Sequence, residues 1–185
     1  NLVLDKPGKE SLVCFWNQRS FWPTAYDPET NSLYVPYVDH CLDMARPKED
    51  GTGGKRRGAL RPGADQSKFA GLAKIDMRTG EIRRLYESRA GGNGAVLATA
   101  GGIVFWGDIT QVLRAFDAET GKVLWQSEPL GATVANSTIT YAVDGKQYVA
   151  VVNGEMLLGA RGIAAAGGIE LPQHRGNSIN VFALP

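Results

Sequence analysis

Residues 115–125 read Ala-Phe-Asp-Ala-Glu-Thr-Gly-Lys-Val-Leu-Trp, with apolar residues on both sides of a short polar turn. The Asp117 side chain can accept hydrogen bonds from backbone amides two or three residues further along the chain. Gly121 tolerates the positive φ that closes such a turn. The stretch therefore predicts two β-strands, over 111–116 and 122–126, joined by a tight hairpin.

The same turn motif occurs three times in the chain. Residues 27–31 read Asp-Pro-Glu-Thr-Asn and residues 76–80 read Asp-Met-Arg-Thr-Gly, so successive copies begin roughly 40–50 residues apart. Repeats of this length are typical of propeller blades, in which each sheet buries its faces only against its neighbours. We therefore expect each copy of the turn to mark one blade.

Other parts of the sequence also favour an all-β protein. Short β-rich segments at 102–107, 134–142 and 147–153 are separated by turn residues, and Asp144-Gly145 is a strong hairpin signal. The 185 residues include 23 glycines, which is typical of a chain with many turns. Only residues 155–166 are expected to form a short helix.

Composition excludes two classes of partner. Lys and Arg number 20 against 19 Asp and Glu, so no overall charge favours nucleic acid. No apolar run approaches the roughly 18 residues of a membrane span. The basic run 55–57 lies within a Gly-rich polar segment, 45–70, which we expect to be a solvated loop insertion. His40 and His174 lack neighbouring ligands at metal spacing, and we expect them at the surface or at strand ends.

Two cysteines, Cys14 and Cys41, stand on either side of the first turn motif. If the strands around Asp27 form a hairpin, the two cysteines can face each other across neighbouring strands. The residues leave two alternatives open, a disulfide in an oxidising compartment or two buried thiols.

Several segments, in order, resemble one family. The segments 92–105, with Gly107-Asp108 and the repeat that ends at Trp125, resemble the quinoprotein alcohol dehydrogenases, which use pyrroloquinoline quinone (PQQ). Residues 140–151 resemble a late hairpin of that family, and residues 21–28 with 33–36 resemble its asparagine-tryptophan-proline segment and the following strand.

The resemblance implies an eight-bladed β-propeller in the periplasm, in which blade tryptophans such as Trp125 dock onto the next blade. The chain, 1–185, would be the C-terminal part of one propeller domain and hold roughly three blades. Within it, 154–176 would be a Gly/Ala-rich loop and 177–184 the closing strand. Too few blades are present to close a ring, so the remainder of the propeller must come from another fragment or chain.

The resemblance also implies a chemistry, the oxidation of alcohols or sugar alcohols to aldehydes or ketones by hydride transfer to PQQ. A calcium or lanthanide ion would assist, bound mainly by residues outside this chain. Glu155 and Glu170 are isolated in the sequence, and Asp108 suits a turn, so no catalytic residue is assigned. The chain lacks a C-x-x-C-H haem site, and an electron acceptor such as a cytochrome c would be elsewhere.

Two segments match family positions that contact PQQ, and one more follows the last hairpin. Gly92 and Asn93 lie in a glycine-rich loop whose backbone would approach the quinone, although Gly92 replaces a frequent tryptophan. Phe21 and Trp22 lie in the second segment, where Phe21 stands in place of an asparagine. Leu158 matches a tryptophan that covers the quinone. Two other interpretations remain, a non-enzymatic propeller scaffold of the bacterial envelope and a small free-standing β-sandwich.

Overall fold

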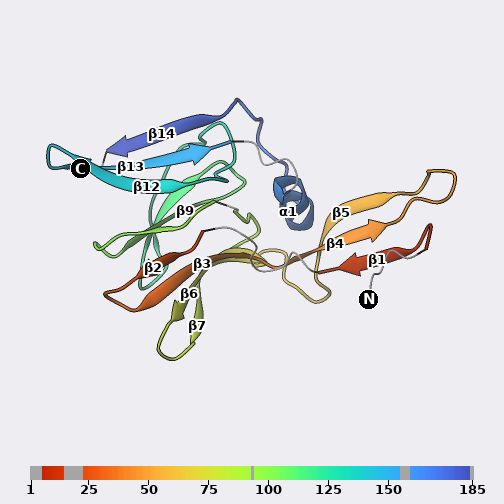
Figure 1. Ribbon diagram of the computed structural model, residues 1–185, viewed down its shortest axis with the longest axis horizontal. Helices are drawn as coiled ribbons and strands as arrows, with labels where there is room; N and C mark the ends of the chain where they lie inside the picture. The colour runs from red at the N-terminus through yellow and green to blue at the C-terminus, as the bar shows by residue number, and fades with distance from the viewer. Residues whose placement is uncertain (1–5, 15–22, 93, 155–158, 184–185) are drawn as a thin grey trace.

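The computed structural model describes residues 6–14, 23–92, 94–154 and 159–183 (Figure 1). These residues form two four-stranded and two three-stranded antiparallel sheets with a single helix. The prediction of an all-β protein is therefore confirmed.

Three of the sheets follow one another along the chain. Sheet 1 has the strand order β2-β3-β6-β7, sheet 2 the order β11-β10-β9-β8 and sheet 3 the order β12-β13-β14. Strand β8 contacts both β2 and β12, so the first strands of the three sheets lie next to one another. The strands are β2 (Ala25–Asp27), β3 (Ser32–Val38), β6 (Ala70–Asp76), β7 (Ile82–Ser88), β8 (Leu97–Ala98), β9 (Ile103–Gly107), β10 (Leu113–Asp117), β11 (Val123–Gln126), β12 (Thr138–Val143), β13 (Lys146–Asn153) and β14 (Ser178–Ala183).

Apolar side chains fill both spaces between these sheets. The cluster between sheets 1 and 2 is centred on Tyr34, Trp106 and Phe116, none of which is exposed. Its counterpart between sheets 2 and 3 includes Phe105 and Val149. Because each sheet is buried against its neighbour, the arrangement is that of successive propeller blades.

The turn motif behaves as predicted, but its copies do not each mark a blade. Asp117 accepts hydrogen bonds from the backbone amides of Glu119 (3.1 Å) and Thr120 (2.7 Å). The first copy joins β2 to β3 and the second joins β6 to β7, so both belong to sheet 1. The Met77 amide of the second copy donates to the Asn31 carbonyl of the first at 3.0 Å. Their separation in sequence comes from an insertion at 39–69, and the expectation of one blade per copy was wrong.

The insertion contributes two strands to a separate three-stranded sheet. Strands β4 (His40–Ala45) and β5 (Lys55–Leu60) pair with each other, and β1 (Glu10–Val13) adds to β4. This sheet projects from sheet 1, at the right of Figure 1. The expected loop over 45–70 therefore contains a strand, because β4 is apolar and needs a partner. The sequence of β5 lacks the usual strand signal because its first residues are polar. One of them, Lys55, binds Asp43 at 2.5 Å.

The two cysteines form a disulfide, which settles the open alternative. Cys14 and Cys41 have Cα atoms 4.1 Å apart. They extend the β1–β4 register beyond the pair Val13–Leu42. The bond therefore links the β1 and β4 sides of the inserted sheet. We had expected the cysteines to face each other across the hairpin around Asp27, but neither lies on β2 or β3.

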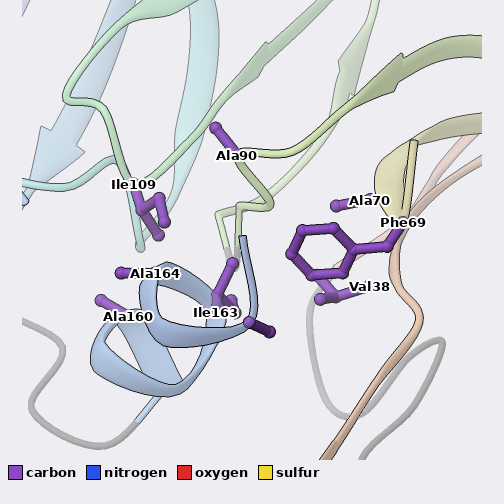
Figure 2. Packing of buried hydrophobic residues seen from close by; sticks show 9 residues of the cluster. Val38, Phe69, Ala70, Ala90, Ile109, Ala160, Ile163 and Ala164 are labelled. Atoms are coloured by element: carbon purple, nitrogen blue, oxygen red, sulfur yellow. The ribbon is translucent and has the colours of Figure 1, made fainter. Parts of the chain in front are cut away.

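Helix α1 (Gly159–Gly167) lies within the Gly/Ala-rich segment 154–176 and overlaps the short helix expected over 155–166. It lies between β13 and β14 of sheet 3 in sequence, yet it packs against β4 and β5 of the inserted sheet. A Cβ atom on Gly58 would lie 1.9 Å from the Gly162 carbonyl oxygen, so helix and strand touch through their backbones. Figure 2 shows Ile163 of α1 facing Val38, the last residue of β3, and Phe69, which directly precedes β6.

Candidate cofactor site

Three segments that precede the inner strands converge at one end of the sheets. The Val96 amide, just before β8, donates to the Pro23 carbonyl, just before β2, at 3.2 Å. The neighbouring Ala95 amide donates to the Asn136 carbonyl, just before β12, at 2.9 Å. Backbone hydrogen bonds thus connect the segments that directly precede β2, β8 and β12.

Glycines allow the backbones to approach closely at this end. A Cβ atom on Gly92 would lie 2.1 Å from the Gly107 carbonyl oxygen, and one on Gly94 would lie 2.7 Å from the Val134 carbonyl oxygen. A Cβ atom on Gly154, at the end of β13, would lie 2.9 Å from Oδ1 of Asn177. Only glycine satisfies such close contacts.

Amide side chains lie where these backbones meet. Asn136 and Asn177 are both exposed, and both come near Gly154. Gly154 is fixed from its other side, because its amide donates to the Thr133 carbonyl (3.0 Å) and its carbonyl accepts from the Thr133 hydroxyl (2.6 Å). The two side-chain amides therefore lie beside a Gly154 backbone that is fixed by hydrogen bonds.

A buried carboxylate lies directly behind the glycine segment. Asp108, in the turn from β9 to β10, has a fully buried side chain that binds Arg114 at 2.5 Å. It also accepts from the Thr110 amide at 2.8 Å and from the Thr110 hydroxyl. Burial raises the pKa of the Asp108 carboxyl, while the charge of Arg114 and the Thr110 hydrogen bonds act in the opposite direction.

The structure tests little of the predicted set of cofactor contacts. Phe21, Trp22, Asn93 and Leu158 all lie outside the described residues. Gly92 is described, and it is buried against Gly107 and the Trp106 ring rather than facing open space. Described residues next to the predicted contacts do lie together. Pro23 follows Trp22, Gly94 follows Asn93, and Gly154 precedes the segment that holds Leu158.

Sequence reasoning missed four polar residues of this region, Asn136, Asn177, Asp108 and Arg114. Asn136 and Asn177 stand in irregular segments without a motif. Asp108 was assigned a turn role, which it has, but the ion pair to a residue six positions later follows only from the β9–β10 pairing. A β-hairpin drawn over 103–117 would have placed both side chains at one end of it.

Side-chain amides, which can donate hydrogen bonds, are among the described groups of this region. PQQ carries carboxylate and quinone oxygens, which need hydrogen-bond donors such as the Asn136 and Asn177 amides. Within the described ranges, no three His, Cys, Asp or Glu side chains gather as a metal site requires. The helix of the described part is also too short and too polar to cross a membrane.

Comparisons with known proteins identify relatives of this chain. Residues 72–149 match the family model described as "PQQ: Glucose/ethanol/alcohol dehydrogenase, beta-propeller domain". The chain is 30% identical over 175 residues to a quinohemoprotein alcohol dehydrogenase of Pseudomonas putida, covering 83% of this chain and 24% of that protein. It is 37% identical over 148 residues to 1-butanol dehydrogenase (cytochrome c) of Thauera butanivorans, covering 75% of this chain and 21% of that protein.

Solved structures show the same fold. A europium-containing methanol dehydrogenase superposes with a TM-score of 0.74 at 23% identity, covering 97% of this chain and 36% of that one. Among the curated relatives, matched by sequence, a lanthanide-dependent methanol dehydrogenase of Methylorubrum extorquens is 29% identical over 185 residues, covering 88% of this chain and 30% of that protein. The chain thus spans about a quarter of the length of the curated relatives it matches.

Proposed function

Because this chain belongs to the PQQ-dependent alcohol dehydrogenase family, as part of its propeller, we propose that it contributes one wall of a PQQ pocket. The whole enzyme would oxidise alcohols or sugar alcohols to aldehydes or ketones, with PQQ as the hydride acceptor. The observation that supports this most strongly is that the segments directly before β2, β8 and β12 converge, joined by the Val96–Pro23 and Ala95–Asn136 hydrogen bonds.

In this proposal the chain holds the cofactor and leaves the proton chemistry to other residues. Asn136 and Asn177 would donate to its oxygens, and the glycine-rich backbone at Gly92 and Gly94 would fix the edge of the pocket. We propose that Phe21, Trp22, Asn93 and Leu158 complete this wall. The main catalytic residues and most ligands of a calcium or lanthanide ion would belong to the remainder of the propeller.

The partner of this chain is accordingly proposed to be that remainder, in the same polypeptide or as a separate one. Sheet 3 has one face buried against sheet 2, while its other face exposes apolar side chains that lie on neighbouring strands. Register places Ile139 beside Ala150 and Val181, and Tyr141 beside Tyr148. Ile139 is 55% exposed and Val181 50% exposed. A further blade would bury this face, as sheet 2 buries the opposite one.

The compartment and the electron acceptor are also proposals. The Cys14–Cys41 disulfide suits an oxidising compartment, and we place the protein in the periplasm. The name of the Thauera butanivorans relative includes cytochrome c. A cytochrome c is therefore our proposed acceptor for electrons from the reduced cofactor.

The test uses the full-length protein that contains this chain. The purified apo-protein is titrated with PQQ in the presence of calcium or of a lanthanide, and then assayed with a primary alcohol and an artificial electron acceptor. We expect saturable PQQ binding and alcohol-dependent reduction of the acceptor with at least one metal. PQQ binding without activity on any alcohol or sugar alcohol, or no binding with either metal, would reject the proposal.

A further inference from the structure

The turn from β9 to β10 lies between two segments of the proposed pocket wall and is hydrogen-bonded to both of them. On one side, the Ile109 amide donates to the Gly91 carbonyl at 3.0 Å. On the other side, the Val134 amide donates to the Asp108 carbonyl at 3.3 Å. A shift of this turn would therefore move the glycine segment and the segment that leads to Asn136 together.

Asp108 and Arg114 are the groups that hold the turn in place. The carboxylate binds Thr110 within the turn and Arg114 on β10, so it links the turn to the sheet. Arg114 is itself fixed, because its guanidinium lies 5.9 Å from the centre of the Tyr86 ring on sheet 1. The chain of contacts runs from sheet 1 through Arg114 and Asp108 to Gly91.

Stability alone does not explain this ion pair, because burying two charges carries a desolvation penalty. The Asp108 side chain is 0% exposed and the Arg114 side chain 13% exposed. Burial removes both charges from water, and replacing such a pair with apolar residues is often neutral or stabilising. A buried pair therefore serves a protein best where it fixes one particular arrangement.

We propose that Asp108 and Arg114 are positioning residues that set the backbone at Gly91 and Gly92 in its PQQ-binding geometry. This inference rests on the proposed function. It assigns to the pair a role in cofactor affinity that is separable from its role in folding.

The experiment measures PQQ affinity and apo-protein stability in parallel, in the full-length protein. The variants are Asp108→Asn, Arg114→Met, the double variant that combines them, and the conservative Arg114→Lys. Glu119→Gln is the matched control. Glu119 pairs with Lys74 and Arg83, but it lies beyond the opposite end of β10 and is 68% exposed. Affinity comes from a PQQ titration, and stability from thermal unfolding without cofactor.

Asp108→Asn and Arg114→Met should each weaken PQQ binding by about 10-fold or more, as the loss of a group that orients a binding residue typically does. Arg114→Lys should restore most of the affinity, and Glu119→Gln should leave it unchanged. The double variant separates the two roles. Removing both charges relieves the unpaired buried charge, so stability should recover, whereas PQQ binding should stay weak.

Two results would contradict the inference. If PQQ affinity recovers together with stability in the double variant, or is unchanged in both single variants, the pair is structural only. If the wild-type protein itself fails to bind PQQ, the proposed function fails first and this inference falls with it.

Discussion

Trp125 on β11 and Phe182 on β14 meet edge to face, with ring centroids 5.0 Å apart and planes at 70°. The two residues belong to successive sheets, so the indole docks one blade onto the next as the family resemblance implied. Together with Phe105 and Leu113 they line an apolar cavity of about 420 Å³ between sheets 2 and 3. The contact gives the tryptophan of the hairpin motif a structural role.

Replacing Trp125 with alanine should loosen this interface. Trp125 is 40% exposed, so we expect a loss of about 2 kcal/mol in the free energy of unfolding, less than for a fully buried tryptophan. Urea unfolding of the full-length protein measures it. Trp125→Phe keeps an aromatic contact and should lose much less, and an equal loss in the two variants would show that the ring contact is unimportant.

The hairpins were predictable because their signals are local. The Asp117 turn is specified by residues within five positions, and the structure reproduces it. The position of each turn in the fold is not local. The copies at Asp27 and Asp76 share a sheet because β3 pairs with β6, and the insertion between these strands accounts for their separation in sequence. The strand β5 within the insertion is too polar to be recognised from its sequence.

In the candidate site too, features with local sequence signals were predictable and features that depend on the fold were not. A glycine-rich segment at Gly92 can be recognised from sequence, since glycine is required where a Cβ atom would collide with a neighbouring backbone. The Asp108–Arg114 pair and the approach of Asn136 to Gly154 depend on strand pairing and on the packing of sheet 3 against sheet 2. No periodicity in the sequence encodes that packing.

Reduction of the Cys14–Cys41 disulfide should destabilise the inserted sheet. The bond closes a loop between residues 27 positions apart, for which the loss of chain entropy corresponds to about 3 kcal/mol. Thermal unfolding of the wild-type protein with and without a reductant measures this difference. The double variant Cys14→Ser/Cys41→Ser should match the reduced wild type and should not respond to reductant. An unchanged melting temperature on reduction would contradict the prediction.

Protonation of His40 should make the protein less stable in mild acid. His40 is 3% exposed, and burial lowers the pKa of its imidazole. The unfolded chain takes up a proton below pH about 6.5, before the folded chain does. The free energy of unfolding should therefore fall as the pH drops below that value, until the folded imidazole also titrates.

Urea unfolding at pH 7.5 and pH 5.5 measures this dependence. His40→Gln removes the titrating group and should flatten the part of the pH dependence that His40 causes. His174→Gln, at an exposed position, is the matched control and should retain the wild-type slope. Equal slopes in His40→Gln and the wild type would assign the acid sensitivity to other groups.

Gly92→Ala should damage the proposed pocket through the backbone alone. The added Cβ atom would lie 2.1 Å from the Gly107 carbonyl oxygen and 2.9 Å from Cα of Asp108, both of which are main-chain atoms that cannot rotate away. The glycine segment must therefore shift away from the β9–β10 turn. A displacement of about 1 Å can lower turnover by up to ~100-fold when it misplaces reacting groups. Gly101→Ala is the matched control, because its nearest neighbour beyond the adjoining residues is the Thr99 hydroxyl oxygen at 3.9 Å. Alcohol-dependent reduction of an artificial acceptor by the two PQQ-loaded variants measures the effect, and similar rates would mean that the glycine segment tolerates the shift.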